Sequence, residues 1–123
     1  MKVLTGIDII EVKRIQENIE KHKTDFLNKI YTKKEIDYCE SRGVQKYQSY
    51  SARFAGKEAV FKAVSKMLNN KYEIGWKDIE ILNDENGRPY VNLNALNHSN
   101  IQIDISLSHT NIEAIASVVI LED

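Results

Sequence analysis

The segment from Lys46 to Leu68 contains no proline and only one glycine, Gly56. Within it, large apolar side chains recur at helical spacing and alanines fill positions between them. The large residues are Tyr50, Phe54, Phe61, Val64 and Leu68, and the alanines stand at positions 52, 55, 59 and 63. This pattern predicts the longest helix of the chain, with small side chains that allow close packing. The fold must therefore be organised around this helix.

The first third of the chain predicts one strand followed by two shorter helical segments. Residues Lys2 to Asp8 alternate loosely between apolar and polar and are rich in branched side chains, which favours a strand that ends at Asp8. Apolar residues at helical spacing then predict a helix from about Ile10 to His22. Thr32 to Glu35 matches a capping box, and Gly43 marks the end of the short helix that follows.

The last third predicts antiparallel strands. Apolar residues around Ile79 to Ile81 and Tyr90 to Leu93 flank Asn86-Gly87, which is a strong hairpin signal. Residues 101 to 108 alternate strictly between apolar and polar, and Ala114 to Leu121 is typical of a more buried closing strand. A strand, then helices, then antiparallel strands indicates an α+β fold, with a mostly antiparallel sheet packed against the long central helix and shorter helices.

Length and charge limit the class of protein. At 123 residues the chain is expected to form a single domain over residues 1–123. The 17 basic and 18 acidic side chains nearly cancel, so nonspecific nucleic-acid binding is not expected. Cys39 is the only cysteine, which excludes an intrachain disulfide and favours a reducing, cytoplasmic setting. The apolar start is too short to span a membrane, so no membrane partner is expected.

Three sets of polar residues are candidates for chemistry, and each also has a simpler interpretation. Asp8 ends the predicted strand, where its carboxylate can project into a cleft or cap the next helix. Glu58 and Lys62 share one helix face, either as a surface ion pair or as a Mg²⁺ ligand beside a phosphate-binding cation. His109 and Thr110 can hydrogen-bond phosphate or ribose, although a histidine at a strand end is also typical of ordinary surface.

Together these segments resemble the three signature blocks of holo-acyl-carrier-protein synthases, which are phosphopantetheinyl transferases. The matching blocks are Gly6-Ile7-Asp8-Ile9 with Arg14-Ile15, then Arg53-Phe54-Ala55 with Lys57-Glu58-Ala59 and Lys62-Ala63, then Ser106 to Thr110. Asn86-Gly87-Arg88-Pro89-Tyr90 resembles the family's hairpin between the second and third blocks. The resemblance covers essentially the whole chain, and its middle block is the most specific part.

The resemblance implies transfer of the 4'-phosphopantetheine arm of coenzyme A to a serine of apo-acyl carrier protein, releasing adenosine 3',5'-bisphosphate, in fatty acid biosynthesis. Asp8 and Glu58 would hold Mg²⁺, with Mn²⁺ left open, against the coenzyme A pyrophosphate. Glu58 would accept the serine proton, directly or through water, and Lys62 would contact the transferring or leaving phosphate. Asp8, Glu58 and Lys62 are thus the implied catalytic residues.

The resemblance also implies how coenzyme A and the carrier bind. Arg53 and His109 match positions that contact the ribose phosphate, with Thr110 beside them, and Gly87, Arg88 and Pro89 would lie beside the adenine. Arg14 matches a carrier-docking position, and the surface lysines Lys13, Lys21 and Lys23 either extend that basic strip or are only solvated charges. The family forms trimers with active sites between subunits, which implies a homotrimer here.

Two other classes of function stay open at this point. A noncatalytic module would bind nucleotide or an acidic partner through Arg14, Arg53 and His109, with Glu58 and Lys62 merely paired. A Mg²⁺-dependent phosphohydrolase would instead cleave coenzyme A without any carrier present.

Overall fold

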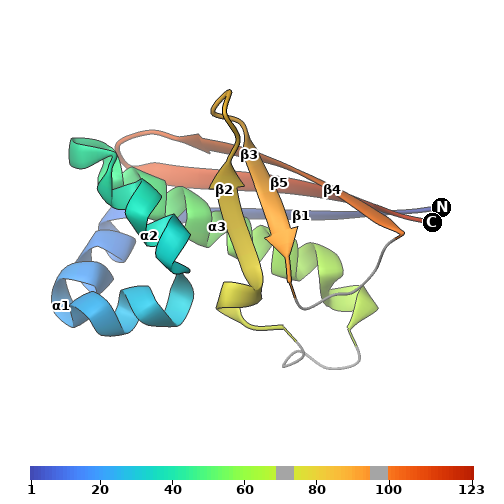
Figure 1. Cartoon of the computed structure of the whole chain (residues 1–123), viewed down its shortest axis with the longest axis horizontal. Coiled ribbons are helices and arrows are strands. Elements are labelled where there is room, and N and C mark those ends of the chain that lie inside the picture. The colour runs from blue at the N-terminus through green and yellow to red at the C-terminus, as the bar shows by residue number, and fades with distance from the viewer. Residues whose placement is uncertain (69–73, 95–99) are drawn as a thin grey trace.

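The strands form two antiparallel sheets in the computed structural model, which describes residues 1–68, 74–94 and 100–123. A three-stranded sheet has the order β1-β5-β4, and a two-stranded sheet pairs β2 with β3. The strands are β1 (Lys2–Glu11), β2 (Ile79–Asn83), β3 (Pro89–Leu93), β4 (Ile101–His109) and β5 (Glu113–Glu122). Because β1 and β5 run antiparallel with Lys2 opposite Glu122, the two ends of the chain lie side by side (Figure 1).

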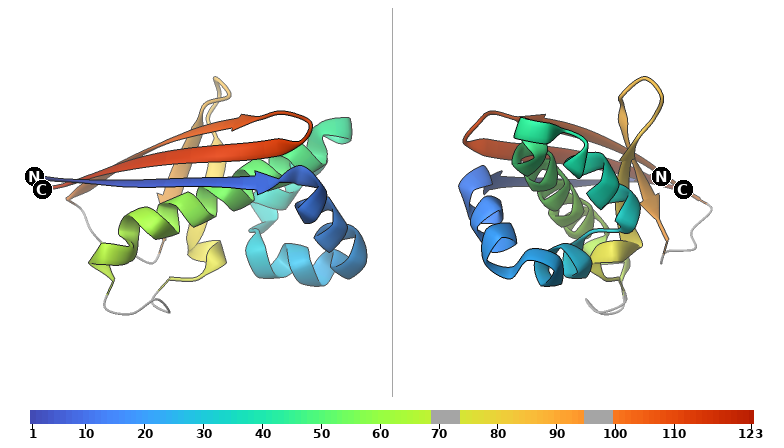
Figure 2. Two further views of the ribbon diagram at one scale, coloured as in Figure 1. Left: turned by 180° about the vertical axis from the view of Figure 1, so that it is seen from behind. Right: turned by 60° about the vertical axis from the view of Figure 1, so that its left-hand side comes forward.

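The helices cover one face and one end of the three-stranded sheet. They are α1 (Val12–Ile30), α2 (Lys33–Glu40) and α3 (Lys46–Val64), joined by the short 3-10 turns η1 (Gly43–Gln45), η2 (Ser65–Met67) and η3 (Trp76–Asp78). Figure 2 shows α3 lying along the sheet, with α1 and α2 gathered at the end where β1 finishes. None of the helices within the described ranges is long and apolar enough to cross a membrane.

Small side chains bring α3 unusually close to the sheet. Ala55 and Ala59 of α3 are fully buried, as are Ala114 and Ala116 of β5. At Gly6 of β1, an added Cβ would lie 1.8 Å from the carbonyl oxygen of Ala59, so only glycine allows this approach. The close contact sets the position of the rest of β1 relative to α3.

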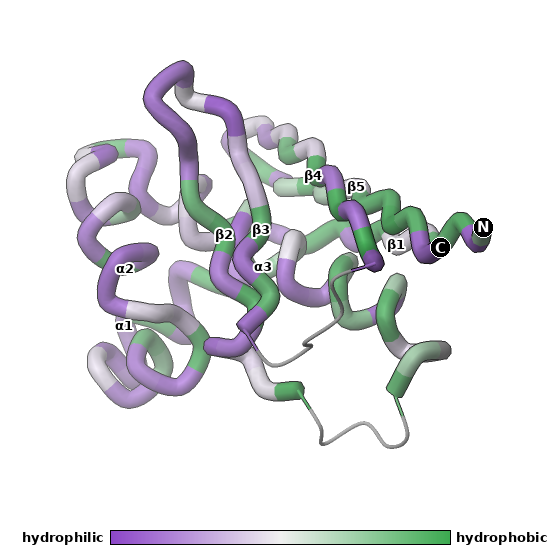
Figure 3. The backbone as a smooth tube through the Cα atoms, turned by 45° about the vertical axis from the view of Figure 1, so that its right-hand side comes forward, coloured by the Kyte–Doolittle hydropathy of each residue, from purple (hydrophilic) through white to green (hydrophobic). Residues whose placement is uncertain are grey.

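The predicted fold class and order of elements are confirmed. The structure has the long central helix, the antiparallel strands and the hairpin whose hydrophilic tip projects from the body (Figure 3). The capping box is also present: Glu35 N donates to Thr32 Oγ1 at 3.3 Å, and Thr32 N donates to Glu35 Oε1 at 2.9 Å. At the hairpin, Gly87 has φ +80°, which explains why glycine stands there.

The first strand is longer than predicted, and this changes the role of Asp8. The strand continues to Glu11, so Asp8 lies within it and faces Ala116 across the ladder. Helix α1 begins at Val12, and its N-cap, Glu11, makes no side-chain capping bond. The interpretation of Asp8 as a helix cap is therefore wrong, because β5 keeps the chain extended for three residues beyond it.

The first helix also continues beyond its predicted end. It reaches Ile30, but Lys23 has φ 42° and ψ −120°, which breaks the helix directly after the predicted end at His22. The expected boundary thus corresponds to a change of direction. The part of α1 after Lys23 runs in a different direction and leads into α2.

Replacing Lys23 by glycine is expected to raise the free energy of unfolding by about 1 kcal/mol, because glycine adopts this positive φ without steric cost. Urea denaturation followed by circular dichroism measures the change. The matched substitution Lys21→Gly, in regular helix, is expected to lower stability by about the same amount. Equal losses in both variants would contradict the strain at Lys23.

Candidate active site

The predicted catalytic residues Asp8, Glu58 and Lys62 come together beside α3. Lys62 Nζ lies 3.0 Å from Oδ1 of Asp8 and donates to the carbonyl oxygen of Ile7 at 2.9 Å. Lys62 therefore pairs with β1 rather than with Glu58 one helical turn away, and the interpretation of Glu58 and Lys62 as a simple surface ion pair is wrong. The Lys62 side chain is half exposed, so its ammonium still meets solvent.

Glu58 interacts electrostatically with both Asp8 and Lys62. Partial burial raises the pKa of the Glu58 carboxyl, the negative charge of Asp8 raises this pKa further, and Lys62 acts in the opposite direction. Both carboxylates line one hollow of about 460 Å³, the carboxylate hollow, with Ile9, Ile10, Glu11, Arg14, Phe54 and Glu113. Two carboxylates that repel each other across one hollow are suited to sharing a cation.

Arg53 is buried rather than presented on an open helix face. Its guanidinium lies 4.3 Å from the centre of the Tyr38 ring, Nη1 donates to Ser49 Oγ at 3.2 Å, and Nη2 donates to Asn83 Oδ1. Within the described part of the chain, the buried Nε has no hydrogen-bond partner. Only 3% of the residue is exposed, so the structure holds the guanidinium in one orientation.

The predicted nucleotide-binding residues lie mostly around Arg53. Gly87, Pro89 and His109 border a hollow of about 180 Å³ together with Arg53, which we call the arginine hollow. Arg88 is exposed at the hairpin tip and does not line this hollow, and its backbone N–H donates to Asp84 Oδ1 at 2.9 Å.

Thr110 forms the turn between β4 and β5, where its hydroxyl oxygen accepts hydrogen bonds from the backbone N–H groups of Ile112 and Glu113. It lines a smaller hollow with His109, Ile9 and Glu113. His109 also borders the arginine hollow, and Ile9 and Glu113 border the carboxylate hollow. The turn therefore lies between the two larger hollows.

The predicted carrier-docking residues share a surface of α1. Lys13, Arg14 and Lys21 line a hollow of about 400 Å³, the α1 hollow, with Glu11, Glu17 and Asn18. Arg14 and Glu11 also line the carboxylate hollow. Lys23 stands at the helix break and does not line this hollow.

Comparison with known proteins identifies the family. A family model described as the 4'-phosphopantetheinyl transferase superfamily matches residues 5–119. The holo-[acyl-carrier-protein] synthase of Ruminiclostridium cellulolyticum is 44% identical over 126 residues, covering 98% of this chain and 92% of that protein. The chain belongs to the holo-[acyl-carrier-protein] synthase family.

Solved structures of other holo-[acyl-carrier-protein] synthases share the fold. The Helicobacter pylori synthase in complex with coenzyme A has a TM-score of 0.82 at 32% identity, over 96% of this chain and 100% of that chain. The Bacillus anthracis synthase in complex with CoA (3',5'-ADP) has a TM-score of 0.80 at 31% identity, over 98% of this chain and 96% of that chain. The family expected from the sequence blocks is confirmed.

Several residues around the site in this synthase-family chain were not predicted. Glu11 and Glu113 face each other across the β1–β5 ladder and add two carboxylates to the carboxylate hollow. No sequence signal marks them, because their meeting depends on strand register. Phe54 follows directly after Arg53 and could have been found, since it stands four residues before Glu58 on α3.

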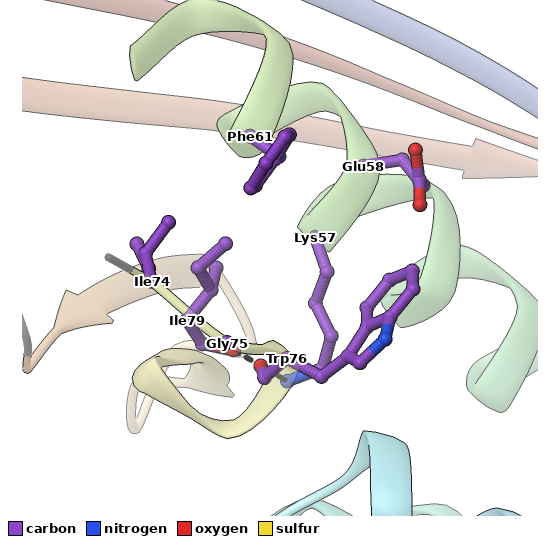
Figure 4. A pocket seen from close by; sticks show the side chains of 7 residues that line it. All are labelled: Lys57, Glu58, Phe61, Ile74, Gly75, Trp76 and Ile79. Atoms are coloured by element: carbon purple, nitrogen blue, oxygen red, sulfur yellow. Dashed lines mark hydrogen bonds between the residues drawn. The ribbon is translucent and has the colours of Figure 1, made fainter. Parts of the chain in front are cut away.

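An apolar hollow of about 360 Å³ lies on the other side of Glu58 and was also not predicted. It is lined by Lys57, Glu58, Phe61, Ile74, Gly75, Trp76 and Ile79 (Figure 4). The Trp76 ring stacks on Phe54 with their centroids 5.1 Å apart. Glu58 thus borders both this apolar hollow and the carboxylate hollow.

Proposed function

We propose that this chain transfers the 4'-phosphopantetheine arm of coenzyme A to the serine of an apo-acyl carrier protein, releasing adenosine 3',5'-bisphosphate. The observation that carries the proposal is that Asp8 and Glu58 line one hollow in a member of the synthase family, with Lys62 paired to Asp8. The product would serve fatty acid biosynthesis. A reducing, cytoplasmic location is part of the proposal, supported by the single buried free cysteine.

Asp8 and Glu58 are suited to holding Mg²⁺, and Mn²⁺ is an alternative. Across the described ranges, no group of three or more histidine, cysteine, aspartate or glutamate side chains could hold a metal ion. Mg²⁺ does not need such a cage, because it commonly takes one or two carboxylates and completes its shell with phosphate oxygens and waters. When bound, the ion would draw charge from the pyrophosphate under attack.

The remaining polar residues would bind coenzyme A and move the proton. Lys62 would leave Asp8 to contact the transferring or leaving phosphate, which its exposed ammonium allows. Glu58 would accept the serine proton directly or through water, and because a metal-bound carboxylate is a weak base, the water relay is the favoured route. The apolar hollow beside Glu58 would receive the pantetheine arm.

The nucleotide end would occupy the arginine hollow, with Arg53 and His109 toward the ribose phosphate and Thr110 beside them. Gly87, Arg88 and Pro89 would border the adenine. The unpartnered Nε of Arg53 and the presence of Gly87, Pro89 and His109 around the same hollow support this role.

The test of the function is a mass measurement on the carrier. Incubation with coenzyme A, Mg²⁺ and apo-acyl carrier protein is expected to add one phosphopantetheine to the carrier, and a chelator is expected to stop the addition. A carrier that stays unmodified while coenzyme A is cleaved would indicate a phosphohydrolase. A carrier that stays unmodified beside intact coenzyme A would indicate a binding module.

Arg14→Ala is expected to raise the KM for the carrier about tenfold and to leave the KM for coenzyme A unchanged, because a docking charge steers an acidic partner. The defect is expected to shrink at high salt, which screens this attraction. Lys29→Ala, an exposed change in the last turn of the same helix, is the control. A defect confined to coenzyme A would contradict the docking role.

A homotrimer with shared sites is also part of the proposal. The face of the three-stranded sheet turned away from α3 exposes the apolar residues Val3, Ile7, Ile9, Ile115 and Val119. Ile9 and Ile115 stand opposite each other in the ladder, so these side chains form one patch, the outer sheet patch. Further copies of this chain would cover it, and the arginine hollow of one copy would then meet the carboxylates of another.

Ile7→Asp is expected to reduce the native mass to about one third of the wild-type value, because a carboxylate on the outer sheet patch cannot be buried without a partner. Light scattering after size-exclusion chromatography measures the mass. Ile112→Asp makes the same change at a residue that is 71% exposed on the β4–β5 turn, and it is expected to leave the mass unchanged. A wild-type chain with the mass of one subunit would refute the trimer.

A further inference from the structure

A fully buried ion pair lies behind the apolar hollow. Lys57 Nζ of α3 is 2.8 Å from Oε1 of Glu35 on α2, and neither side chain has any exposed surface. Lys57 precedes Glu58 on α3, but its side chain runs into the interior, toward the backbone of the segment from Gly75 to Ile79 (Figure 4). The proposed reaction gives this pair no chemical step.

The pair is saturated with hydrogen bonds to the backbone. Lys57 Nζ donates to the carbonyl oxygen of Trp76 at 3.0 Å and to that of Ile79, so with Glu35 its three N–H groups are all used. Glu35 accepts from Thr32 N at 2.9 Å and from Ile81 N at 2.8 Å. Two side chains thus join the start of α2, the turn η3 and the strand β2 to the middle of α3.

The pair forms hydrogen bonds with the edge of β2 that a neighbouring strand would otherwise form. Among the described residues β2 pairs with β3 alone, which leaves the polar groups of its other edge without a ladder. The carbonyl of Ile79 and the N–H of Ile81 on this edge are satisfied by Lys57 and Glu35. Left unpaired in the interior, these backbone groups would be costly.

The ion pair is not explained by its contribution to the free energy of unfolding, because a buried ion pair often adds little net stability. Burial lowers the pKa of Lys57, and the Glu35 carboxylate only opposes that effect. Removing two charges from water is so costly that apolar side chains of similar volume often serve the fold equally well. What apolar side chains cannot do is hold four backbone groups from three segments in one arrangement.

The segment from Gly75 to Ile79, which the pair binds, forms one wall of the apolar hollow. Trp76, whose carbonyl binds Lys57, stacks its ring on Phe54 at an interplanar angle of 28°. Glu58 stands at the rim between this ring and the carboxylate hollow. A shift of Trp76 would therefore change the shape of the hollow immediately beside Glu58.

We propose that the Lys57–Glu35 pair is a positioning element of the transfer reaction, which fixes Trp76 against Phe54 and so sets the shape of the hollow for the pantetheine arm. The inference rests on the proposed function, because the hollow is assigned to coenzyme A there. Lys57 also lines the hollow, but its ammonium and the Glu35 carboxylate are bonded to each other and to the backbone, so the pair acts through the position of the wall.

The test is the double variant Lys57→Met/Glu35→Gln, which removes both charges; glutamine keeps the length of the glutamate, and methionine is one atom shorter than the lysine. Lys33→Met/Asp37→Asn is the matched control, since it neutralises an exposed pair on α2 with the same 2.8 Å separation. Trp76 is the only tryptophan, so acrylamide quenching of fluorescence reports on the wall without any need for activity. Quenching, melting temperature and the KM of each substrate are measured for both variants.

In the Lys57/Glu35 variant the quenching constant of Trp76 is expected to rise roughly twofold, and the KM for coenzyme A about tenfold, because small displacements of positioning groups are costly. The KM for the carrier is expected to stay unchanged, since docking lies on α1. A variant that quenches like the control and keeps its KM for coenzyme A overturns the proposal. So does a fall in kcat and melting temperature with both KM values unchanged, which is the result of lost stability alone.

Two further outcomes are also decisive. If the wild-type chain transfers nothing, the proposed function fails, while the quenching comparison still decides whether the pair holds Trp76. If the double variant does not fold, Glu35→Gln alone is judged by the same criteria, because it keeps the shape of the side chain and one acceptor oxygen.

Discussion

Replacing Glu58 by glutamine is expected to lower kcat by at least about a hundredfold, which is the usual contribution of a positioned acid or base. The substitution keeps the size of the side chain but removes the carboxylate that is proposed to bind Mg²⁺ and to accept the proton. The carrier mass-shift assay, run as a time course, measures the rate. Glu20→Gln, the same change at an exposed position of α1, is the control and is expected to keep the wild-type rate.

The Glu58→Gln variant is also expected to fold at least as stably as the wild type at neutral pH. Burial and the charge of Asp8 raise the pKa of Glu58 in the folded chain above its unfolded value. At a pH above that raised pKa, the ionised carboxylate therefore lowers the free energy of unfolding. As the pH falls below the unfolded pKa, this loss disappears, and the free energies of unfolding of the wild type and of the Glu58→Gln variant are expected to converge. A variant that loses activity because it unfolds would contradict the assignment of Glu58 to the site.

Gly6→Ala is expected to lower the free energy of unfolding by about 3 kcal/mol or more, at the upper end of the usual cost of overpacking. The new Cβ would lie 1.8 Å from the carbonyl oxygen and 2.8 Å from the carbonyl carbon of Ala59, which are backbone atoms that no rotamer change can move. For a chain of this size the melting temperature is expected to fall by roughly 10 °C. Thermal unfolding followed by circular dichroism measures the loss.

Gly75→Ala is the matched control for Gly6→Ala. Gly75 has an extended backbone, with φ −106° and ψ 177°, and its added Cβ would meet only Asp78 Oδ2 at 3.5 Å. The control is expected to change stability by about 0.5 kcal/mol or less. Similar losses in both variants would show that β1 and α3 are not in the close contact described above. Any Gly6→Ala protein that does fold is expected to show impaired transfer, because Asp8 stands two residues farther along the displaced strand.

Much of the fold was predictable because it follows from local patterns. The spacing of apolar residues in α3, the strict alternation in β4, the capping box at Thr32 and the Asn86-Gly87 turn each act over a few residues. Their order along the chain was enough to indicate an α+β fold, and the signature blocks were enough to indicate the family.

The candidate site was predictable in its members but not in its contacts. The blocks pointed to Asp8, Glu58 and Lys62, yet the helical spacing of Glu58 and Lys62 suggested a pair that does not form. Lys62 instead reaches Asp8, which is distant in sequence. Arg53 was expected to contact the ribose phosphate, but only the structure shows that Tyr38 and Asn83 from other elements contact its guanidinium.

The kinds and order of the elements, the family and the charged residues of the candidate site followed from the sequence, because periodicity and motifs are properties of neighbouring residues. Tertiary structure alone decided that β1 runs on past Asp8, that Glu11 meets Glu113, and that Lys57 enters the interior while Glu58 faces a hollow. Strand register and helix rotation depend on the packing of the whole core, where Gly6 allows β1 to approach α3 closely and the buried Lys57–Glu35 pair joins α3 to α2.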